Sequence, residues 1–267
     1  MTSVNLLMFL FLCCNYVWCF GKRHTQPVIE EDAADLPVGE LLYRANRGIV
    51  PGPDEPTLID DIAVNEKNAD PCTANDCLWN QSGDGNIWIP YVIADHYSSS
   101  EKEIIKRGLD SFSDISCVRF FPRNNERDYI SIESRSGCYS YVGRQGYGQV
   151  LSLARNGCIY HSTIQHELLH ALGFNHEQTR SDRDSYIKIM WENIIEDKKH
   201  NFNKIDTLNQ GSFYDYGSVM QYERFAFSKN GYATMVPYPN INAHLGGATQ
   251  MSQNDIDRLN RLYKCCK

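Results

Sequence analysis

The segment HELLHALGFNH, from His166 to His176, constrains the fold of this chain more than any other part of its sequence. His166 and His170 are four residues apart, so on a helix their side chains lie on one face and can reach one point. Gly173 can adopt a positive φ and end the helix, which lets the chain turn back and bring His176 to the same point. Three converging imidazoles that leave a fourth position open are the ligand set of a catalytic zinc site. We therefore predict that these histidines bind one Zn²⁺.

Glu167 lies beside the first predicted ligand. It is about 100° round the helix from His166, near the metal without being forced to bind it, where it can accept a proton from water. A bare HExxH pattern arises by chance on the order of once in several thousand positions, but a third histidine and the glycine make the match far rarer. The alternative, a buried helix with ordinary core histidines, would place three costly polar groups beside an already apolar stripe. Glu167 is the predicted catalytic base.

The helix that carries this motif is predicted to begin at Ser162. The Ser162 hydroxyl and Gln165, three residues on, match a capping box. Its apolar stripe is made of Ile164, Leu168, Ala171 and Leu172. An earlier helix is expected from about Ser99 to Phe112 with Ser100 as its N-cap, and a final one near Asn254 to Tyr263.

Strand-like stretches dominate the part of the chain before the motif. They run from Asn86 to Ile93, Cys117 to Phe121, Tyr129 to Glu133 and Val150 to Leu153. From Trp191 onward the pattern is mixed and rich in loops. These features predict one α+β domain, and the length of 267 residues allows it a substantial core.

The N-terminus predicts a secreted chain. The apolar run LLMFLFLCCNYVWCF is too short and too near the start for a convincing membrane span, so we predict a signal peptide over residues 1–21. The usual basic n-region is missing, and a signal anchor is the alternative. No later apolar run approaches the roughly 20 residues of a spanning helix.

Residues 22–67 have the composition of a propeptide. The segment is polar and acidic, and five prolines interrupt any long periodic pattern, as in a chain without its own core. Residues 1–67 hold five Lys and Arg against ten Asp and Glu, a net −5, whereas residues 68–267 hold 21 against 23, a net −2. Because the body is nearly neutral, bulk charge gives no indication of nucleic-acid binding.

Seven of the ten cysteines remain once the signal peptide is removed. They are Cys72, Cys77, Cys117, Cys138, Cys158, Cys265 and Cys266. Secretion favours disulfides, so six are expected to pair and one of the last two to be left over. A cysteine zinc site is disfavoured because Cys72 and Cys77 are too far apart for a CxxC knuckle.

The string HELLHALGFNHEQTRSDRD, followed by SVMQY at Ser218 to Tyr222, resembles the astacin family of metzincin proteinases. The resemblance extends from about Asn68 to Cys266. The extra Cys72 and Cys77 make the teleost hatching enzymes, or six-cysteine astacins, the nearest group. The resemblance implies a zincin fold with two subdomains. The N-terminal one has a twisted, mostly parallel or mixed sheet and two long helices, and the C-terminal one is rich in loops.

The resemblance also implies roles for the SVMQY segment. Met220 is expected in a tight turn beneath the zinc site, where ordinary core packing is the alternative. Tyr222 is expected to be a fifth zinc ligand that moves to stabilise the oxyanion. Gln221 stands where many astacins have histidine, so a role of that histidine is not carried over.

A latent precursor is implied as well, in which a propeptide aspartate binds the zinc. The matching residue in TLIDDIAV is Asp61, although the family usually has Phe and Gly where Leu58 and Asp60 stand. Asp60 is therefore a competing candidate, and a merely solvated acidic pair is the other alternative. Carboxylate oxygens are suitable zinc ligands.

Activation is expected to follow cleavage after Lys67 by a protease of trypsin-like specificity. By the resemblance, the new N-terminus at Asn68 becomes buried near Glu177, for which a salt bridge with Arg180 is the alternative interpretation. The body contains one sequon, Asn80-Gln-Ser82, which allows N-glycosylation at Asn80 or an unused site.

The disulfides implied by the resemblance are Cys72 with Cys77, Cys138 with Cys158, and Cys117 with either Cys265 or Cys266. An extended substrate is expected to add as a strand near Cys138 to Tyr141.

The expected function is that of a secreted, monomeric zinc endopeptidase acting on extracellular proteins, with egg-envelope glycoproteins at hatching as the favoured substrates. Storage in secretory granules is compatible with this role. A secreted astacin of adult epithelium, kidney or immune tissue is the alternative. An inactive zinc-retaining binding protein is disfavoured because neither Glu167 nor any predicted histidine ligand is lost.

Overall fold

The computed structural model describes residues 35–64 and 77–265, so the predicted signal peptide, Asn68 and Cys72 lie outside the described residues. Its main feature is a seven-stranded sheet with the order β1-β2-β6-β7-β5-β3-β4. The strands are β1 Thr57–Ile59, β2 Ile62–Val64, β3 Ile87–Ile93, β4 Val118–Pro122, β5 Tyr129–Glu133, β6 Cys138–Tyr141 and β7 Gly148–Leu153. The four strands predicted from composition are all present, with ends shifted by at most two residues.

The sheet is mixed, as predicted. Strand β3 pairs in parallel with β4 and β5, and β5 pairs in parallel with β7. Strand β6 is antiparallel to β7, and its other edge pairs in parallel with β2. Strands β1 and β2 therefore extend the sheet with a hairpin from the predicted propeptide.

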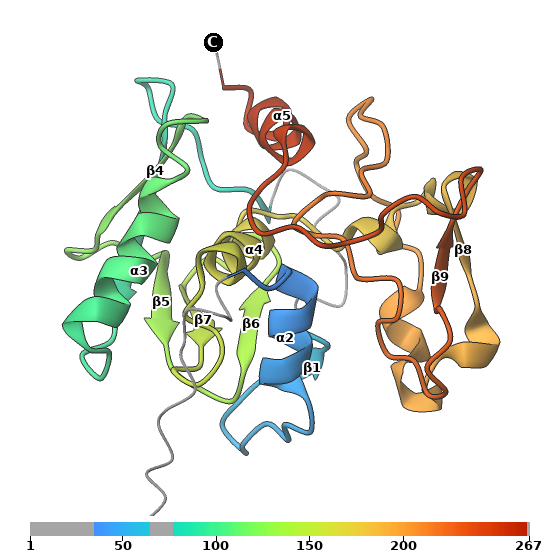
Figure 1. Ribbon diagram of the computed structural model, residues 1–267. Coiled ribbons are helices and arrows are strands. Elements are labelled where there is room, and N and C mark those ends of the chain that lie inside the picture. The colour runs from blue at the N-terminus through green and yellow to red at the C-terminus, as the bar shows by residue number, and fades with distance from the viewer. Residues whose placement is uncertain (1–34, 65–76, 266–267) are drawn as a thin grey trace, which may run out of the picture.

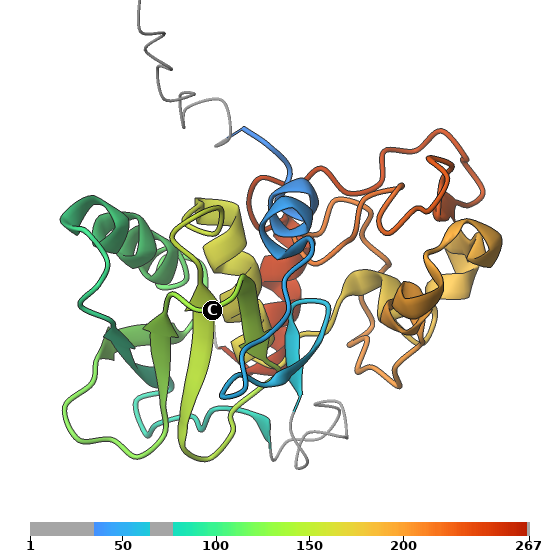
Figure 2. The same ribbon diagram turned by 90° about the horizontal axis from the view of Figure 1, so that it is seen from below.

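Two helices, α3 (Ser99–Asp110) and α4 (His161–Ala171), lie together on one side of this sheet (Figures 1 and 2). Their apolar faces and the inward-facing residues of the strands form the larger core of the molecule. Gly108 of α3 allows a close approach to α4, since a Cβ at this position would lie 2.3 Å from Cγ2 of Ile164. This packing fixes the helix that carries the zinc motif.

Both predicted N-caps were wrong. Helix α3 is capped by Ser98 instead of Ser100, because the Ser98 hydroxyl and the Glu101 carboxylate form a reciprocal capping box. Helix α4 has Tyr160 at its N-cap and no side-chain cap. The Gln165 side chain instead accepts from the backbone N–H of Met251 at 2.8 Å and donates to Ser111 Oγ at 3.0 Å, so it joins separate segments.

The C-terminal half has little regular structure, as predicted. It contains the 3₁₀ helices η2 Glu177–Thr179, η3 Arg183–Ser185, η4 Trp191–Asn193 and η5 Glu196–Phe202, the short strands β8 Ile187–Ile189 and β9 Met235–Pro237, and helix α5 Gln253–Leu262. Figure 1 shows its small two-stranded sheet of β8 and β9 on the side of the molecule away from the large sheet, whereas α5 packs back on the larger core. A second, smaller core of aromatic and aliphatic side chains lies beneath this two-stranded sheet.

The predicted propeptide contains a helix that the sequence analysis missed, α2 (Val38–Asn46). Its Val38 and Leu42 are buried in the larger core, and the Val38 backbone N–H donates to Ala248 O at 2.8 Å. Helix α2 thus contacts both halves of the body where they meet (Figure 1). Within the two described ranges, no helix has the length and apolar character needed to cross a membrane.

Candidate metal centre and active site

The three predicted histidine ligands meet at one buried point. His170 Nε2 lies 3.1 Å from His166 Nε2 and 3.2 Å from His176 Nε2. Ligands placed tetrahedrally at 2.0 to 2.1 Å from Zn²⁺ are about 3.3 Å apart, so this spacing fits a zinc ion. The three rings and one carboxylate, that of Asp61, form a buried group whose donor atoms all lie within 4.8 Å of one another.

Backbone carbonyls orient two of these rings. His166 Nδ1 lies 2.8 Å from Val219 O, and His170 Nδ1 lies 2.7 Å from Phe174 O. A carbonyl accepts only, so each Nδ1 carries the proton and each Nε2 directs its lone pair to the cluster. Burial also lowers the pKa of His170 to about 4, which favours the neutral form that binds metal. Lone pairs that face one another in a buried site require a cation between them, so the donor set fits Zn²⁺.

Gly173 ends α4 in the way the sequence indicated. Its φ is 101°, and its N–H donates to His170 O at 2.8 Å. The Phe174 N–H then bonds Leu169 O at 3.0 Å, which places the Phe174 carbonyl against the His170 ring and leads the chain back to His176. A residue with a side chain at position 173 would be strained at this φ.

Met220 lies in a fully buried turn that comes from the C-terminal half. The Asp255 carboxylate, at the N-terminus of α5, accepts from Ser218 Oγ at 2.6 Å and from the Val219 N–H at 2.9 Å. Because the Val219 carbonyl orients His166, Asp255 fixes the turn that holds a ligand. The sequence analysis did not identify Asp255, although Ser252 and Asp255 have capping-box spacing.

Asp61 reaches the histidine cluster from the predicted propeptide. Its two carboxylate oxygens lie 3.0 Å from His166 Nε2 and 3.0 Å from His176 Nε2. Burial alone would raise the pKa of Asp61, but the surrounding His176, His166 and His170 rings outweigh it and hold this pKa well below its usual range. An ionised carboxylate at this position could supply a fourth, oxygen donor to a metal held by the three histidines.

Asp60 has a different partner. Its carboxylate accepts a hydrogen bond from the Tyr222 hydroxyl, and its backbone has a φ of 60°, a left-handed conformation that glycine adopts most easily. Burial and the neighbouring Asp61 carboxylate raise the pKa of Asp60 to about 7. The two adjacent aspartates therefore do not compete for one position. Asp61 faces the histidines and Asp60 faces the tyrosine.

Tyr222 lies beside the third histidine, with the ring centroids of Tyr222 and His176 4.6 Å apart. Its neighbour Gln221 is buried, accepts from the Tyr214 hydroxyl and donates to Tyr222 O at 2.9 Å. Gln221 thus acts as a packing residue that fixes the backbone of Tyr222.

Glu167 is fully buried beside the cluster, and neither of its carboxylate oxygens has a hydrogen-bond partner among the described residues. Burial raises its pKa well above the usual value, and the Asp61 and Asp60 carboxylates raise it further. A bound Zn²⁺ acts in the opposite direction on such a group. An unpaired buried carboxyl next to a metal site has the placement of a catalytic base.

Glu177 lies in a buried ionic network. It pairs with Arg180 at 3.0 Å and with Arg258 of α5, and it accepts from the Asp215 N–H at 2.9 Å. Its predicted partner Asn68 lies outside the described residues. Arg258 was not predicted, and no local pattern in the sequence marks it as a buried partner of Glu177.

Two disulfides have both of their cysteines among the described residues, and Cys77 is disulfide-bonded as well. The structure joins Cys138 to Cys158 and Cys117 to Cys265. The alternative partner Cys266 lies outside the described residues, as does Cys72 of the third predicted pair. Asn80 is exposed, as glycosylation would require.

Comparison with known proteins agrees with this geometry. The family model for the astacin peptidases matches residues 79–264. The low choriolytic enzyme of Oryzias latipes is 48% identical over 240 residues, which cover 88% of this chain and 87% of the relative. The high choriolytic enzyme 1 of the same fish is 49% identical over 207 residues, or 77% of each chain.

A solved structure extends the agreement to three dimensions. The structure described as high choriolytic enzyme 1, a hatching enzyme zinc-protease from medaka, matches with a TM-score of 0.70 and 49% identity, over 73% of this chain and 98% of that one. The fold and the histidine cluster define a zinc metalloendopeptidase. Within that class, the chain belongs to the astacin family.

Proposed function

We propose that this chain is a secreted precursor whose mature form hydrolyses egg-envelope proteins at hatching. The observation that carries the proposal is the buried histidine cluster with the unpaired Glu167 beside it, close to strand β6. The substrate class is proposed from two relatives of nearly 50% identity whose names describe them as choriolytic enzymes.

His166, His170 and His176 would hold the zinc. When bound, Zn²⁺ supplies a Lewis acid that polarises the scissile carbonyl and lowers the pKa of a water molecule. Glu167 accepts the proton of the attacking water and passes it to the leaving nitrogen. The Tyr222 hydroxyl donates to the oxyanion once Asp60 no longer accepts from it.

Latency follows from three contacts of residues 35–64 in this proposal. Asp61 occupies the position of the fourth zinc donor, Asp60 accepts from Tyr222, and β2 pairs with the edge strand β6 where an extended substrate would add. Cleavage after Lys67, outside the described residues, would separate this segment from the body. The disulfides are consistent with secretion, which the predicted signal peptide over residues 1–21 would direct.

The function is tested by treating purified egg envelope with the activated protein and identifying the fragments by mass spectrometry. We expect soluble envelope fragments, and none when a zinc chelator is added. Activated protein that cleaves casein but leaves the envelope intact would retain the endopeptidase and reject the substrate.

The latency is tested with Asp61→Ala and Asp60→Gly precursors that cannot be cut after residue 67. We expect Asp61→Ala to cleave a small peptide substrate at least tenfold faster than the wild-type precursor. Asp60→Gly should raise activity less, because Asp61 still faces the histidines. A fully latent Asp61→Ala precursor would assign the block to the bulk of the segment.

A further inference from the structure

Glu223, the residue after Tyr222, lies beneath the N-terminus of helix α2. Its carboxylate faces the backbone N–H of Glu40, in the first turn of that helix, and the Glu40 side chain is also close enough to act on it. Helix α2 has Pro37 at its N-cap and no side-chain cap of its own. The other carboxylate oxygen of Glu223, Oε1, is buried and has no partner among the residues that the structure describes. Glu223 of the body therefore lies against the first turn of a helix of the predicted propeptide.

The body fixes the position of Glu223. Gly246 has a φ of 76°, and a Cβ there would lie 2.9 Å from the Cα of Glu223. On the opposite side, a Cβ at Gly39 of α2 would lie 3.1 Å from Cγ of Glu223. Removal of the propeptide removes the contact with Gly39 but leaves the contact with Gly246. Glu223 therefore keeps its backbone position in the mature enzyme.

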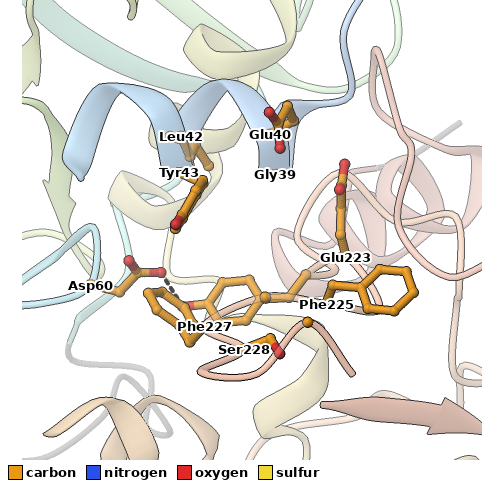
Figure 3. A pocket seen from close by; sticks show the side chains of 12 residues that line it. Gly39, Glu40, Leu42, Tyr43, Asp60, Glu223, Phe225, Phe227 and Ser228 are labelled. Carbon is orange, nitrogen blue, oxygen red and sulfur yellow. Dashed lines mark hydrogen bonds between the residues drawn. The ribbon is translucent and has the colours of Figure 1, made fainter. Parts of the chain in front are cut away.

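Beside Glu223 is a cavity of about 300 Å³ between α2 and the body. Figure 3 shows Glu223 directed toward α2 near Gly39, with Phe225, Phe227 and Ser228 along the body wall. Tyr222, which lies beside His176, lines the same cavity, so the cavity adjoins the catalytic centre. Removal of α2 and Asp60 opens the cavity toward the cleft and leaves an aromatic wall with one carboxylate.

This wall has the chemistry that recognises a long cationic side chain. The aliphatic part of lysine or arginine packs on aromatic rings, the charge is attracted to their faces, and the end forms a charge-assisted hydrogen bond with a carboxylate. The N-terminus of α2, with its partial positive charge, occupies this position in the precursor. Of the basic residues nearby, Arg224 turns away and donates to Ile241 O and Ala243 O at 2.9 Å. His244 packs against Gly247 and is near enough to lower the pKa of Glu223, but no hydrogen bond joins the two side chains among the described residues.

We propose that Glu223 determines specificity in the mature enzyme by binding a lysine or arginine side chain of the substrate next to the scissile bond. This proposal rests on the endopeptidase activity given under the proposed function. It adds which substrate side chain is bound beside the zinc site.

Matched peptides test this directly. One series carries lysine at each of the three positions on either side of the cleaved bond, and two others carry norleucine or glutamate there. For wild-type activated enzyme we expect, at one position, a kcat/KM about tenfold higher for lysine than for norleucine. In Glu223→Gln this ratio should fall to about one. Glu192→Gln, an exposed acid of the same half, is the matched control and should keep the wild-type ratio.

A second variant separates recognition from a structural role. Glu223→Lys should reverse the preference, so that the glutamate peptide is cleaved faster than the lysine peptide at the same position. Zinc content and near-UV circular dichroism identify variants that failed to fold. An unchanged lysine to norleucine ratio in Glu223→Gln, or no cationic preference at any position in the wild type, would overturn the proposal. Because the substrates are synthetic peptides, neither outcome depends on whether egg envelope is digested.

Discussion

The two halves of the body hold their parts of the active site by different means. In the N-terminal half, His166, Glu167 and His170 lie on α4, which packs against both the regular sheet and its neighbour α3. In the C-terminal half, Met220 and Tyr222 lie on irregular backbone, close to the 3₁₀ helix that follows His176. Both halves meet within one zinc site, although only one has the rigidity of long secondary structure.

In the C-terminal half, buried polar contacts fix the conformation of the loops. Packing of helices and strands has this role in the N-terminal half. Arg180 has no exposed surface, and it bonds the carboxylates of Glu177 and Asp182 as well as the carbonyls of Ser212 and Phe213. Such networks specify a loop conformation because each unpaired member would be costly. We therefore expect the two halves to differ in how strongly single substitutions affect catalysis and stability.

Glu167→Gln on the regular half should have the largest effect on catalysis. We expect kcat/KM to fall by about 10³ to 10⁴, because the amide cannot accept the proton, while bound zinc stays near one per chain. Peptide cleavage and metal analysis measure the two quantities. Retained turnover would remove Glu167 from its catalytic role, and loss of zinc would show that the carboxylate supports the ligands instead.

Arg180→Met should reveal how much the polar network stabilises the irregular half. Removal of one partner leaves Glu177 with a buried charge that is only partly compensated, so we expect the free energy of unfolding to fall by about 3 to 5 kcal/mol. The comparison variant in the regular half is Ile132→Val, at a fully buried position of β5, with an expected loss of about 1 kcal/mol.

Urea unfolding in an inactive Glu167→Gln background avoids self-digestion in both variants. Equal losses for Arg180→Met and Ile132→Val would contradict the difference drawn between the halves.

Tyr222→Phe tests the catalytic contribution of the irregular half. The phenylalanine keeps the ring against His176 and removes only the hydroxyl, so we expect kcat to fall by about 10² with little change in KM. Steady-state kinetics with the activated protein separates the two constants. A rise in KM alone would assign the tyrosine to substrate binding.

Glu101→Ala should have the smallest effect, because it changes only a cap of α3. We expect a loss of about 1 kcal/mol at neutral pH, and a smaller one for the exposed Glu103→Ala, which tests the predicted Ser100 cap. The hydrogen bond from Arg155, and those from Ser98, lower the pKa of Glu101 from 4.5 to about 2.

A lowered carboxylate pKa stabilises the fold above pH 4.5, and that contribution disappears as the pH falls toward 2. The difference between wild type and Glu101→Ala should therefore be present at about pH 7 and shrink below the ordinary carboxylate pKa. A difference that stays constant down to about pH 3 would exclude ionisation as its source.

The regular half was largely predictable from the sequence because its signals are local. The stripe of α4, the spacing of His166 and His170, and the ends of β5 follow from periodicity within a few residues. The wrong caps of α3 and α4 show the limit of this approach. Ser98 and Ser100 both have glutamate three residues later, and tertiary contacts of Gln165 overrode the apparent cap at Ser162.

The remainder of the site depends on contacts between distant residues. Nothing near Asp255 in the sequence indicates that it would hold the turn at Val219, and nothing near Glu223 indicates that it would lie against α2. The segment Val38–Asn46 was missed because it is short and its apolar residues are buried by the body instead of by neighbours in its own segment. Long-range partners of this kind leave no periodic signal.

The pairing of β2 with β6 also bears on the behaviour of the precursor at high concentration. An open strand edge offers backbone donors and acceptors to any other chain, and such edges promote association between molecules. In the precursor, the hairpin of β1 and β2 covers this edge of β6. The segment thus covers an edge that could otherwise associate with another chain, and under the proposed function its removal after cleavage would expose that edge.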